Sequence, residues 1–346
     1  MIQDATGNLL EADAEALVNT VNCVGFMGKG IALQFKLAWP DNFEAYAEAC
    51  KAGEVQPGRM FIWETGRMIN PKFLINFPTK RHWKGKSRIE DIKSGLRALV
   101  AEIRRLGIRS VAVPPLGCGN GGLDWTDVRP LIEAAFAELS DVEVSLYSPQ
   151  GAPAAKAMPV NTAKPKMTAS RALFIKLMHQ YGTLSYRRTL LEIQKLGYFL
   201  QESGEPLRLR FEAGIYGPYA SNLNKVLELL EGHYIRGYGD SQKPDTEVEL
   251  LPGAVEDADN FLTSHSDSVT RLLRVAELIE GFETPYGMEL LSTVHWVCTH
   301  GETKAIDAEA AIRSVQSWND RKREMFRCEH IRLAHRRLSE LAWLSA

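Results

Sequence analysis

Two glycine-rich segments have the residue types and spacing to take part in chemistry. Met27-Gly28-Lys29-Gly30-Ile31-Ala32 follows an apolar run, and residues 114–123 place four glycines in six positions. Glycine lets backbone N–H groups approach an anion closely, and a helix that begins at such a loop adds partial positive charge. One such segment alone is more often a plain turn. Two of them in a short stretch of chain favour a diphosphate ligand.

Lys80 is the candidate catalytic residue. It follows the apolar run 73–77, so we expect it to leave a sheet at the edge where the glycine segments also lie. An amine partly removed from water has a lowered pKa and can act as a nucleophile. Alternatively, Lys80 acts as a cation or acid that stabilises charge on a departing group. A solvated lysine beside Arg81, His82 and Lys84 is the ordinary alternative.

Other reactive side chains are weaker candidates. Cys118 lies in a glycine segment, but no placed His or Asp accompanies it, so we expect a packed thiol. His295 and His300 are five positions apart on an expected helix, which puts them on different faces. The five cysteines form no C-x-x-C pair. We therefore expect no metal, no cofactor and no disulfide framework, and a reducing cytoplasm as the location.

The first 150 residues alternate between strand-like apolar runs and helical periodicity. This alternation predicts an α/β domain of three layers with a largely parallel or mixed sheet. The glycine segments then lie at the carboxyl ends of strands, where open α/β sheets bind ligands. The expected strands are residues 16–21, 59–63, 73–77, 110–114 and 142–147, and the expected helices are 30–38, 89–106 and one from an N-cap at Thr126 to Leu139.

The rest of the chain follows a proline- and lysine-containing segment, residues 148–167, which has no aromatic residue. We interpret 151–167 as a linker between a domain of residues 1–150 and a mainly helical domain of residues 168–346. The extended piece 207–213 adds a small β element to the second domain. The expected helices there are 169–180, 185–200, 221–230, 268–279, 286–298 and one long helix over 321–344.

Charge and length exclude several classes of protein. The 346 residues carry 41 basic and 43 acidic side chains, a net charge of −2, which argues against a protein coated in nucleic acid. The chain has no apolar run of 18 residues and begins without a basic and apolar leader, so we expect neither a membrane span nor a secretory signal. Residues 245–259 contain six acidic residues and no Lys or Arg, which indicates a solvated loop or a surface that imitates DNA phosphates.

Several motifs resemble the macrodomain, the ADP-ribose-binding fold. They are Thr6-Gly7-Asn8-Leu9, then Asn19-Thr20-Val21-Asn22 leading into residues 28–32, then residues 116–123. Phe77-Pro78-Thr79-Lys80 with Trp83 resembles the branch of ADP-ribosyl glycohydrolases that use a lysine. A macrodomain of this branch followed by a helical domain resembles the DarG antitoxins of DarTG toxin–antitoxin systems, whose toxins ADP-ribosylate bases of single-stranded DNA.

The resemblance implies a role for individual positions of this chain. Lys80 would be catalytic, and Asn22 would hydrogen-bond the distal ribose. The related lysine-dependent hydrolases carry an acidic residue in the second glycine loop, whereas this loop reads Asn120-Gly121-Gly122, and Asp124 is the nearest carboxylate. The implied ADP-ribose contacts are Asn8 and Leu9 near the adenine, Gly28, Lys29, Gly30, Ile31 and Ala32 on one side of the diphosphate, Leu116, Gly117, Cys118, Gly119, Asn120 and Gly121 on the other, and Thr20, Val21 and Thr79.

The resemblance also implies an activity and partners. The macrodomain would hydrolyse the N-glycosidic bond between ADP-ribose and a base of single-stranded DNA. Residues 168–346 would bind the cognate toxin, an ADP-ribosyltransferase of the DarT type. A non-hydrolytic reader of ADP-ribose and a hydrolase of ADP-ribosylated protein are the alternatives.

Overall fold

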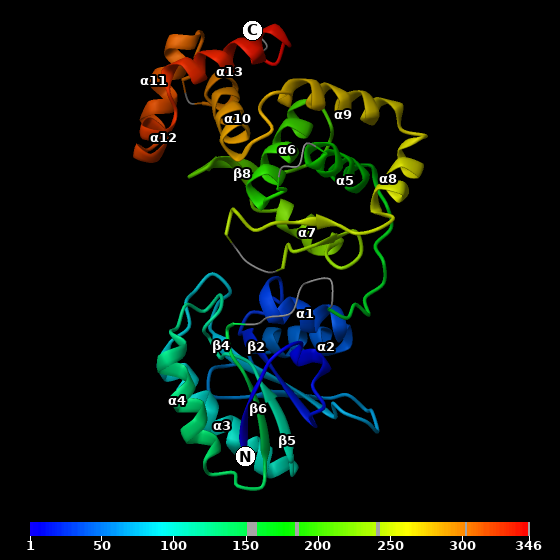
Figure 1. Ribbon diagram of the computed structural model, residues 1–346, viewed down its shortest axis with the longest axis vertical. Coiled ribbons are helices and arrows are strands. Elements are labelled where there is room, and N and C mark those ends of the chain that lie inside the picture. The colour runs from blue at the N-terminus through cyan, green and yellow to red at the C-terminus, as the bar shows by residue number, and fades with distance from the viewer. Residues whose placement is uncertain (151–157, 184–186, 240–242, 302, 345–346) are drawn as a thin grey trace. The chain divides into compact units, whose positions relative to one another are not determined.

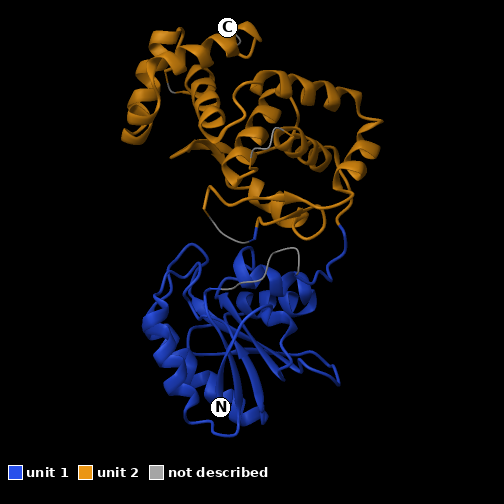
Figure 2. Ribbon diagram, in the orientation of Figure 1, with its two compact units in different colours: residues 1–164, 239–242 blue, residues 165–238, 243–346 orange. Residues whose placement is uncertain are grey.

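The computed structural model describes residues 1–150, 158–183, 187–239, 243–301 and 303–344. The chain forms two compact units, one of residues 1–164 with 239–242 and one of residues 165–238 with 243–346 (Figure 2). Part of the expected linker, 151–157, and the first residues of one expected helix, 185–186, lie outside the described residues.

The first unit is built on a mixed six-stranded sheet. Its strands are β1 (Ile2–Ala5), β2 (Ala16–Asn22), β3 (Phe61–Glu64), β4 (Phe73–Lys80), β5 (Ser110–Val113) and β6 (Glu143–Tyr147), in the spatial order β1-β6-β5-β2-β4-β3. All neighbours are parallel except β3 and β4. β2, β4 and β5 therefore end at the same edge of the sheet.

Alternation along the strands divides the core between the two faces of this sheet. On β2, Ala16 and Val18 lie in one buried cluster, whereas Leu17 lies in another. The first cluster is shared with α3 (Ile89–Leu106) and α4 (Trp125–Phe136), and the second with α1 (Gly30–Ala38). Since side chains point to opposite faces at successive positions, the sheet is covered on both sides. Figure 1 shows this arrangement, with α2 (Pro40–Lys51) on the side of α1.

The prediction of a three-layer α/β domain is confirmed. The expected bounds of α1 and α3 match the structure, while β1 and α2 were not predicted. The expected N-cap of α4 is wrong, because Asp124 occupies that position and its side chain accepts from the Thr126 N–H. Helix α3 packs closely on the sheet at Gly95, where an added Cβ would lie 2.2 Å from the Phe77 ring, three residues before Lys80.

The second unit is mainly helical. Helix α10 is buried along most of its length and packs against α6 and α13. The β elements are two short pairs, β7 with β8 and β9 with β10. The elements are α5 (Ala169–Gly182), α6 (Leu190–Glu202), β7 (Phe211–Gly214), β8 (Gly217–Ala220), α7 (Leu223–Leu230), β9 (Ile235–Arg236), β10 (Glu249–Leu250), α8 (Ala254–Leu262), α9 (Ser266–Ile279), α10 (Pro285–Thr299), α11 (Ala308–Trp318), α12 (Asp320–Met325) and α13 (Cys328–Glu340).

Three expectations for the second unit are corrected. The long helix expected over 321–344 is two helices, because Phe326 has an extended backbone and its side chain is buried. The acidic run 245–259 is not a single loop, since it includes β10 and the first turns of α8. Helix α11 was not predicted.

The described end of the expected linker is partly attached to the first unit. The Asn161 backbone N–H donates to the Leu37 carbonyl at 2.7 Å, and its side-chain amide donates to the Ala38 carbonyl at 2.7 Å. Met158 packs against the core cluster that includes α1. In the described residues, no helix is both long enough and apolar enough to cross a membrane.

Candidate active site

Three loops gather at the edge of the sheet where β2, β4 and β5 end. In the register of the parallel pair β2 and β4, Asn22 lies opposite Lys80. Residues 23–29 follow β2, residues 81–88 follow β4, and residues 114–124 follow β5. The sequence-predicted glycine segments and the predicted catalytic lysine thus belong to neighbouring strands.

Lys80 lies against the second glycine loop. Its Nζ donates to the backbone carbonyl of Asn120. Burial lowers the pKa of the Lys80 amine below its ordinary value, because removal from water disfavours the charged form. The amine is therefore held in place and is more easily deprotonated than a surface lysine.

Asn22 organises the loop that follows β2. Its Oδ1 accepts from the Val24 N–H at 3.0 Å, and its Nδ2 donates to the Phe26 carbonyl. The Tyr46 hydroxyl donates to the Asn22 carbonyl at 2.6 Å. The side chain expected to contact the distal ribose thus makes its hydrogen bonds inside the loop, and what it positions is the chain between β2 and α1.

The two glycine loops approach each other at Gly30. This residue has φ +59°, and a Cβ there would lie 3.1 Å from the side-chain amide of Asn120. Lys29, the N-cap of α1, makes no side-chain capping hydrogen bond. A helix start of this kind presents backbone amides and a positive dipole end to an anion.

The second glycine loop is tightly folded around Ser87. A Cβ at Gly121 would lie 2.1 Å from the Gly117 carbonyl oxygen and 2.4 Å from Ser87 Oγ. The Ser87 N–H donates to the Gly121 carbonyl at 3.0 Å. In contrast, a Cβ at Gly119 would meet nothing within 4 Å. Gly121 is therefore required by the fold of the loop itself, while Gly119 faces open space.

Sequence reasoning missed Ser87. Its contact with the glycine loop joins segments about thirty positions apart, and no local pattern signals it.

Asn8, at the expected adenine end, has an unsatisfied polar atom. Its buried Nδ2 has no hydrogen-bond partner among the described residues. The other amide atom of Asn8, Oδ1, accepts from the Leu10 N–H at 3.1 Å and caps the short helix Leu9–Glu11.

Several expected contact residues are packed inside the unit. Leu9 belongs to a buried core cluster. Val21 and Thr79 are also buried. Burial raises the pKa of the Cys118 thiol to about 11, which keeps it protonated and fits a packed thiol rather than a nucleophile.

Asp124 is occupied as a helix cap. Its carboxylate accepts from the Thr126 N–H at 2.9 Å and from the Thr126 hydroxyl at 2.7 Å. These hydrogen bonds hold the pKa of the Asp124 carboxyl below its ordinary value. An anionic cap bound to its own helix is a poor candidate for general acid catalysis.

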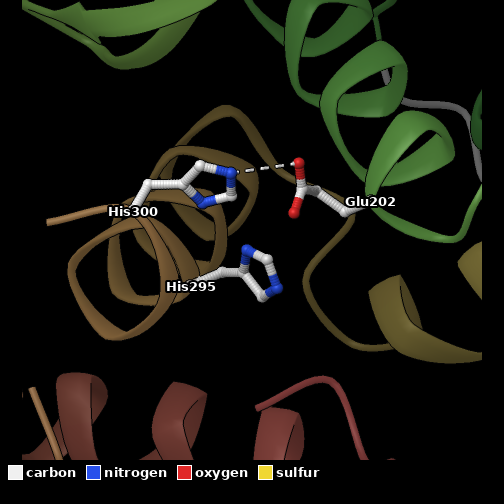
Figure 3. A group of neighbouring side chains, drawn as sticks. All are labelled: Glu202, His295 and His300. Atoms are coloured by element: carbon white, nitrogen blue, oxygen red, sulfur yellow. Dashed lines mark ion pairs between the residues drawn. The ribbon is translucent and has the colours of Figure 1, made fainter. Parts of the chain in front are cut away.

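A separate polar cluster lies in the second unit, where Glu202, His295 and His300 converge (Figure 3). His300 is the C-cap of α10, and its ring stacks on that of Trp296, with centroids 4.7 Å apart. The two histidine ring centroids are 6.3 Å apart, and His300 Nε2 lies 3.5 Å from Glu202 Oε1. The prediction that the two histidines point apart is therefore wrong.

The hydrogen bonds of His295 leave few ligand atoms for a metal. Its Nδ1 lies 2.7 Å from the Tyr198 hydroxyl and its Nε2 lies 3.2 Å from the Trp343 carbonyl. Burial lowers the pKa of His295 to about 4, so the ring is neutral, with one nitrogen accepting and the other donating. Glu202 and one nitrogen of His300 remain, fewer than the ligands of a zinc site. We therefore expect no metal here.

The chain is similar to known proteins over most of its length. The Macro domain family model matches residues 18–132. A DNA ADP-ribosyl glycohydrolase of Thermus aquaticus is 47% identical over 322 residues, which cover 93% of this chain and 89% of the relative. A DNA ADP-ribosyl transferase-DNA ADP-ribosyl glycohydrolase fusion protein of Thermosipho africanus is 37% identical over 158 residues, 41% of this chain and 40% of the relative.

A solved structure matches the first unit. The macrodomain of Mycobacterium tuberculosis DarG shares 57% sequence identity and covers 43% of this chain and 99% of that chain, with a TM-score of 0.43. The fold of the first unit, its strand-end lysine and glycine loops, and the relative that matches almost end to end lead to one conclusion: the chain belongs to the DNA ADP-ribosyl glycohydrolase family, also called DarG.

Proposed function

We propose that this protein removes ADP-ribose from ADP-ribosylated bases of single-stranded DNA, as an antitoxin of a DarTG system. The observation that carries the proposal is the placement of Lys80. Its amine lies against the second glycine loop, opposite Asn22 in the sheet register, and its pKa is lowered by burial. A diphosphate bound between the glycine loops would bring the distal ribose to this amine.

The proposed reaction consumes one water per bond broken. In the nucleophilic version, the Lys80 amine attacks the anomeric carbon, the base leaves with the bonding electrons and takes up a proton, and water hydrolyses the imine to release ADP-ribose and restore the amine. In the electrostatic version, water attacks the anomeric carbon directly while the Lys80 ammonium stabilises charge on the departing base. Neither version needs a metal or a cofactor.

Release of free ADP-ribose from a modified single-stranded oligonucleotide tests the proposal. We expect the full chain to release ADP-ribose and regenerate the unmodified base, measured by chromatography and mass spectrometry. Binding without release would identify a reader of ADP-ribose. Release from ADP-ribosylated protein but not from the oligonucleotide would identify a protein hydrolase.

We also propose that residues 168–346 bind the cognate DarT-type toxin. A toxin that acts on DNA needs a basic groove, so its inhibitor should present acidic groups. Residues 168–346 carry 21 basic and 25 acidic side chains, and six of the acidic ones fall within 245–259. The relative in which a transferase and a glycohydrolase are fused supports a pairing of the two activities.

The structure divides these six acidic residues into two groups. Glu247 is paired with Arg187 at 2.8 Å and Asp259 with Lys176 at 2.8 Å, both within the second unit. Of the other four, Asp245, Glu249 and Glu256 are exposed and form no ion pair with the described residues, whereas Asp257 is half-buried. These three are the best candidates for attraction to a basic groove. We place both functions in a reducing cytoplasm, which the five free thiols support.

A further inference from the structure

A surface beside Lys80 combines exposed aromatic rings with a run of cations. Residues 80–88 read KRHWKGKSR, which contains five Lys or Arg and no Asp or Glu. All of residues 81–86 and Arg88 are exposed. The chain as a whole is slightly acidic, so this concentration of positive charge is local to the edge of the sheet that carries the candidate active site.

Two aromatic side chains from different loops meet on this surface. Phe26 is 51% exposed and Trp83 is 40% exposed, and their ring centroids lie 5.9 Å apart. The His82 ring stacks on Trp83 with a centroid separation of 5.5 Å and an interplanar angle of 27°. Neither Phe26 nor Trp83 belongs to a core cluster. The packing of this unit therefore does not explain why large apolar rings are held together in water.

Most of the cations beside these rings are not neutralised. Arg81 is paired with Asp91 at 2.9 Å. Lys84 Nζ lies 5.0 Å from the centroid of the Trp83 ring. The described chain places no carboxylate within ion-pair distance of Lys84, Lys86 or Arg88. Three cations therefore remain for an external anion.

The aromatic rings and the cations lie close to the candidate active site in the sequence, and hydrogen bonds join their loops to it. Trp83 follows Lys80 by three residues. The Phe26 carbonyl accepts from Asn22, which lies opposite Lys80 in the register of β2 and β4. At the other end of the segment, Ser87 is hydrogen-bonded to the second glycine loop. A nucleic-acid strand lying across this surface would pass the Lys80 amine.

We propose that Phe26, His82 and Trp83 stack against bases of the DNA strand that carries the modification, while Lys84, Lys86 and Arg88 contact its phosphates. The inference rests on the proposed function. Exposed rings beside unpaired cations suit single-stranded nucleic acid, because its bases are free to stack and its phosphates are regularly spaced. A duplex keeps its bases stacked inside, and a protein substrate offers no row of phosphates.

The test compares two groups of variants of the full chain. The ring variant carries Phe26→Ala and Trp83→Ala, and the cation variant carries Lys84→Gln, Lys86→Gln and Arg88→Gln. Matched controls are Ile69→Ala, an exposed apolar residue of another loop, and the pair Lys93→Gln with Arg97→Gln, exposed cations of α3. Three quantities are measured for each: the Kd for an unmodified single-stranded oligonucleotide, the Kd for free ADP-ribose, and KM and kcat for ADP-ribose release from the modified oligonucleotide.

We expect the ring variant to raise the oligonucleotide Kd and KM by roughly tenfold or more, since stacking on one aromatic residue contributes roughly fivefold to a hundredfold in affinity. Trp83→Phe with Phe26 intact should retain most of the affinity. The cation variant should lower the slope of log Kd against log salt by about 2, as three lost phosphate contacts predict for single strands. Free ADP-ribose should bind all variants within twofold of the parent.

The outcomes separate this inference from the proposed function. If the parent releases ADP-ribose from DNA but both variants keep the parental KM and oligonucleotide Kd, the strand-binding surface is wrong and the function stands. If the variants lose the same factor on ADP-ribosylated protein, the surface does not recognise DNA and the inference is also overturned. If the parent releases no ADP-ribose from DNA, the function fails, and the unmodified-oligonucleotide measurement still decides whether this surface binds a strand.

Discussion

The Lys80 amine donates a hydrogen bond to a carbonyl of the loop expected to hold the diphosphate, so the proposed catalytic group and the expected binding loop are in direct contact. When ligand binds, the Lys80 amine can leave this carbonyl and contact the substrate instead. The structure favours neither of the two roles for Lys80, because both require the same position and the same partial removal from water. The dependence of rate on pH distinguishes them.

We expect Lys80→Ala to lower the rate of ADP-ribose release by about 10²–10⁴-fold while free ADP-ribose still binds. If the amine is the nucleophile, kcat of the parent rises with pH through the lowered pKa of Lys80, Lys80→Arg is inactive, and borohydride traps a covalent adduct. If the ammonium acts by its charge, kcat falls over the same pH range and Lys80→Arg retains activity. Turnover by Lys80→Ala within a few-fold of the parent would exclude both roles.

Glu202 provides a prediction for stability. Burial raises the pKa of its carboxyl from 4.5 to about 7. Because the folded state prefers the protonated form, the folded protein loses stability as pH rises from about 4.5 to about 7 and keeps that cost above pH 7. Glu202→Gln should therefore raise Tm at pH 8 and change it little at pH 4.5. A lower Tm for Glu202→Gln at pH 8 would contradict this account.

The second glycine loop is the element that best tests diphosphate binding, and Gly119 is its most suitable position. A side chain at Gly121 would collide with the loop's own backbone, whereas one at Gly119 meets no protein atom within 4 Å. We expect Gly119→Glu to fold normally and to weaken ADP-ribose binding by at least tenfold, since a carboxylate would repel the diphosphate. Calorimetry measures the affinity, with Gly119→Ala as the uncharged control. Unchanged affinity in folded Gly119→Glu would refute the loop assignment.

The elements differ in how well the sequence predicts them. α3 has clear apolar periodicity, so its bounds follow from the chain alone. β1 is four residues long with no buried position, and it exists because β6 pairs with it. The histidine pair was predicted wrongly because the convergence of His295 and His300 on Glu202 of α6 is a tertiary contact, which the spacing of the two histidines does not show. Glycine loops and Lys80 are visible in sequence, but Ser87 and the meeting of Phe26 with Trp83 depend on tertiary contacts.

At the scale of the whole molecule, the proposal gives the chain two independent ways to protect DNA. We expect the full chain with Lys80→Ala to bind and inhibit the toxin although it repairs nothing. Toxin activity on single-stranded DNA is measured against the ratio of the two proteins. If this variant leaves the toxin fully active at excess, the assignment of toxin binding to residues 168–346 is wrong.

The acidic surface makes a separate whole-molecule prediction. Neutralising Asp245, Glu249 and Glu256 to Asn or Gln should slow association with the toxin by about tenfold at low salt and much less at high salt, because charge attraction mainly accelerates encounter and is screened by ions. The matched control neutralises the exposed residues Glu277, Glu324 and Glu340 of the same unit. Surface plasmon resonance gives the rates. Equal association rates for both triple variants would move the contact elsewhere on the domain.

Ser87 is hydrogen-bonded to Gly121 and packs inside the loop expected to hold the diphosphate, yet it also belongs to the basic segment 80–88. A conformational change in the basic segment must therefore alter the second glycine loop, and the reverse also holds. The consequence is thermodynamic linkage: if bound ADP-ribose changes the affinity of the protein for a DNA strand, the strand changes the affinity for ADP-ribose by the same factor. Cleavage of the glycosidic bond separates the repaired strand from ADP-ribose. Once one product has left, the other is held without that coupling of affinities.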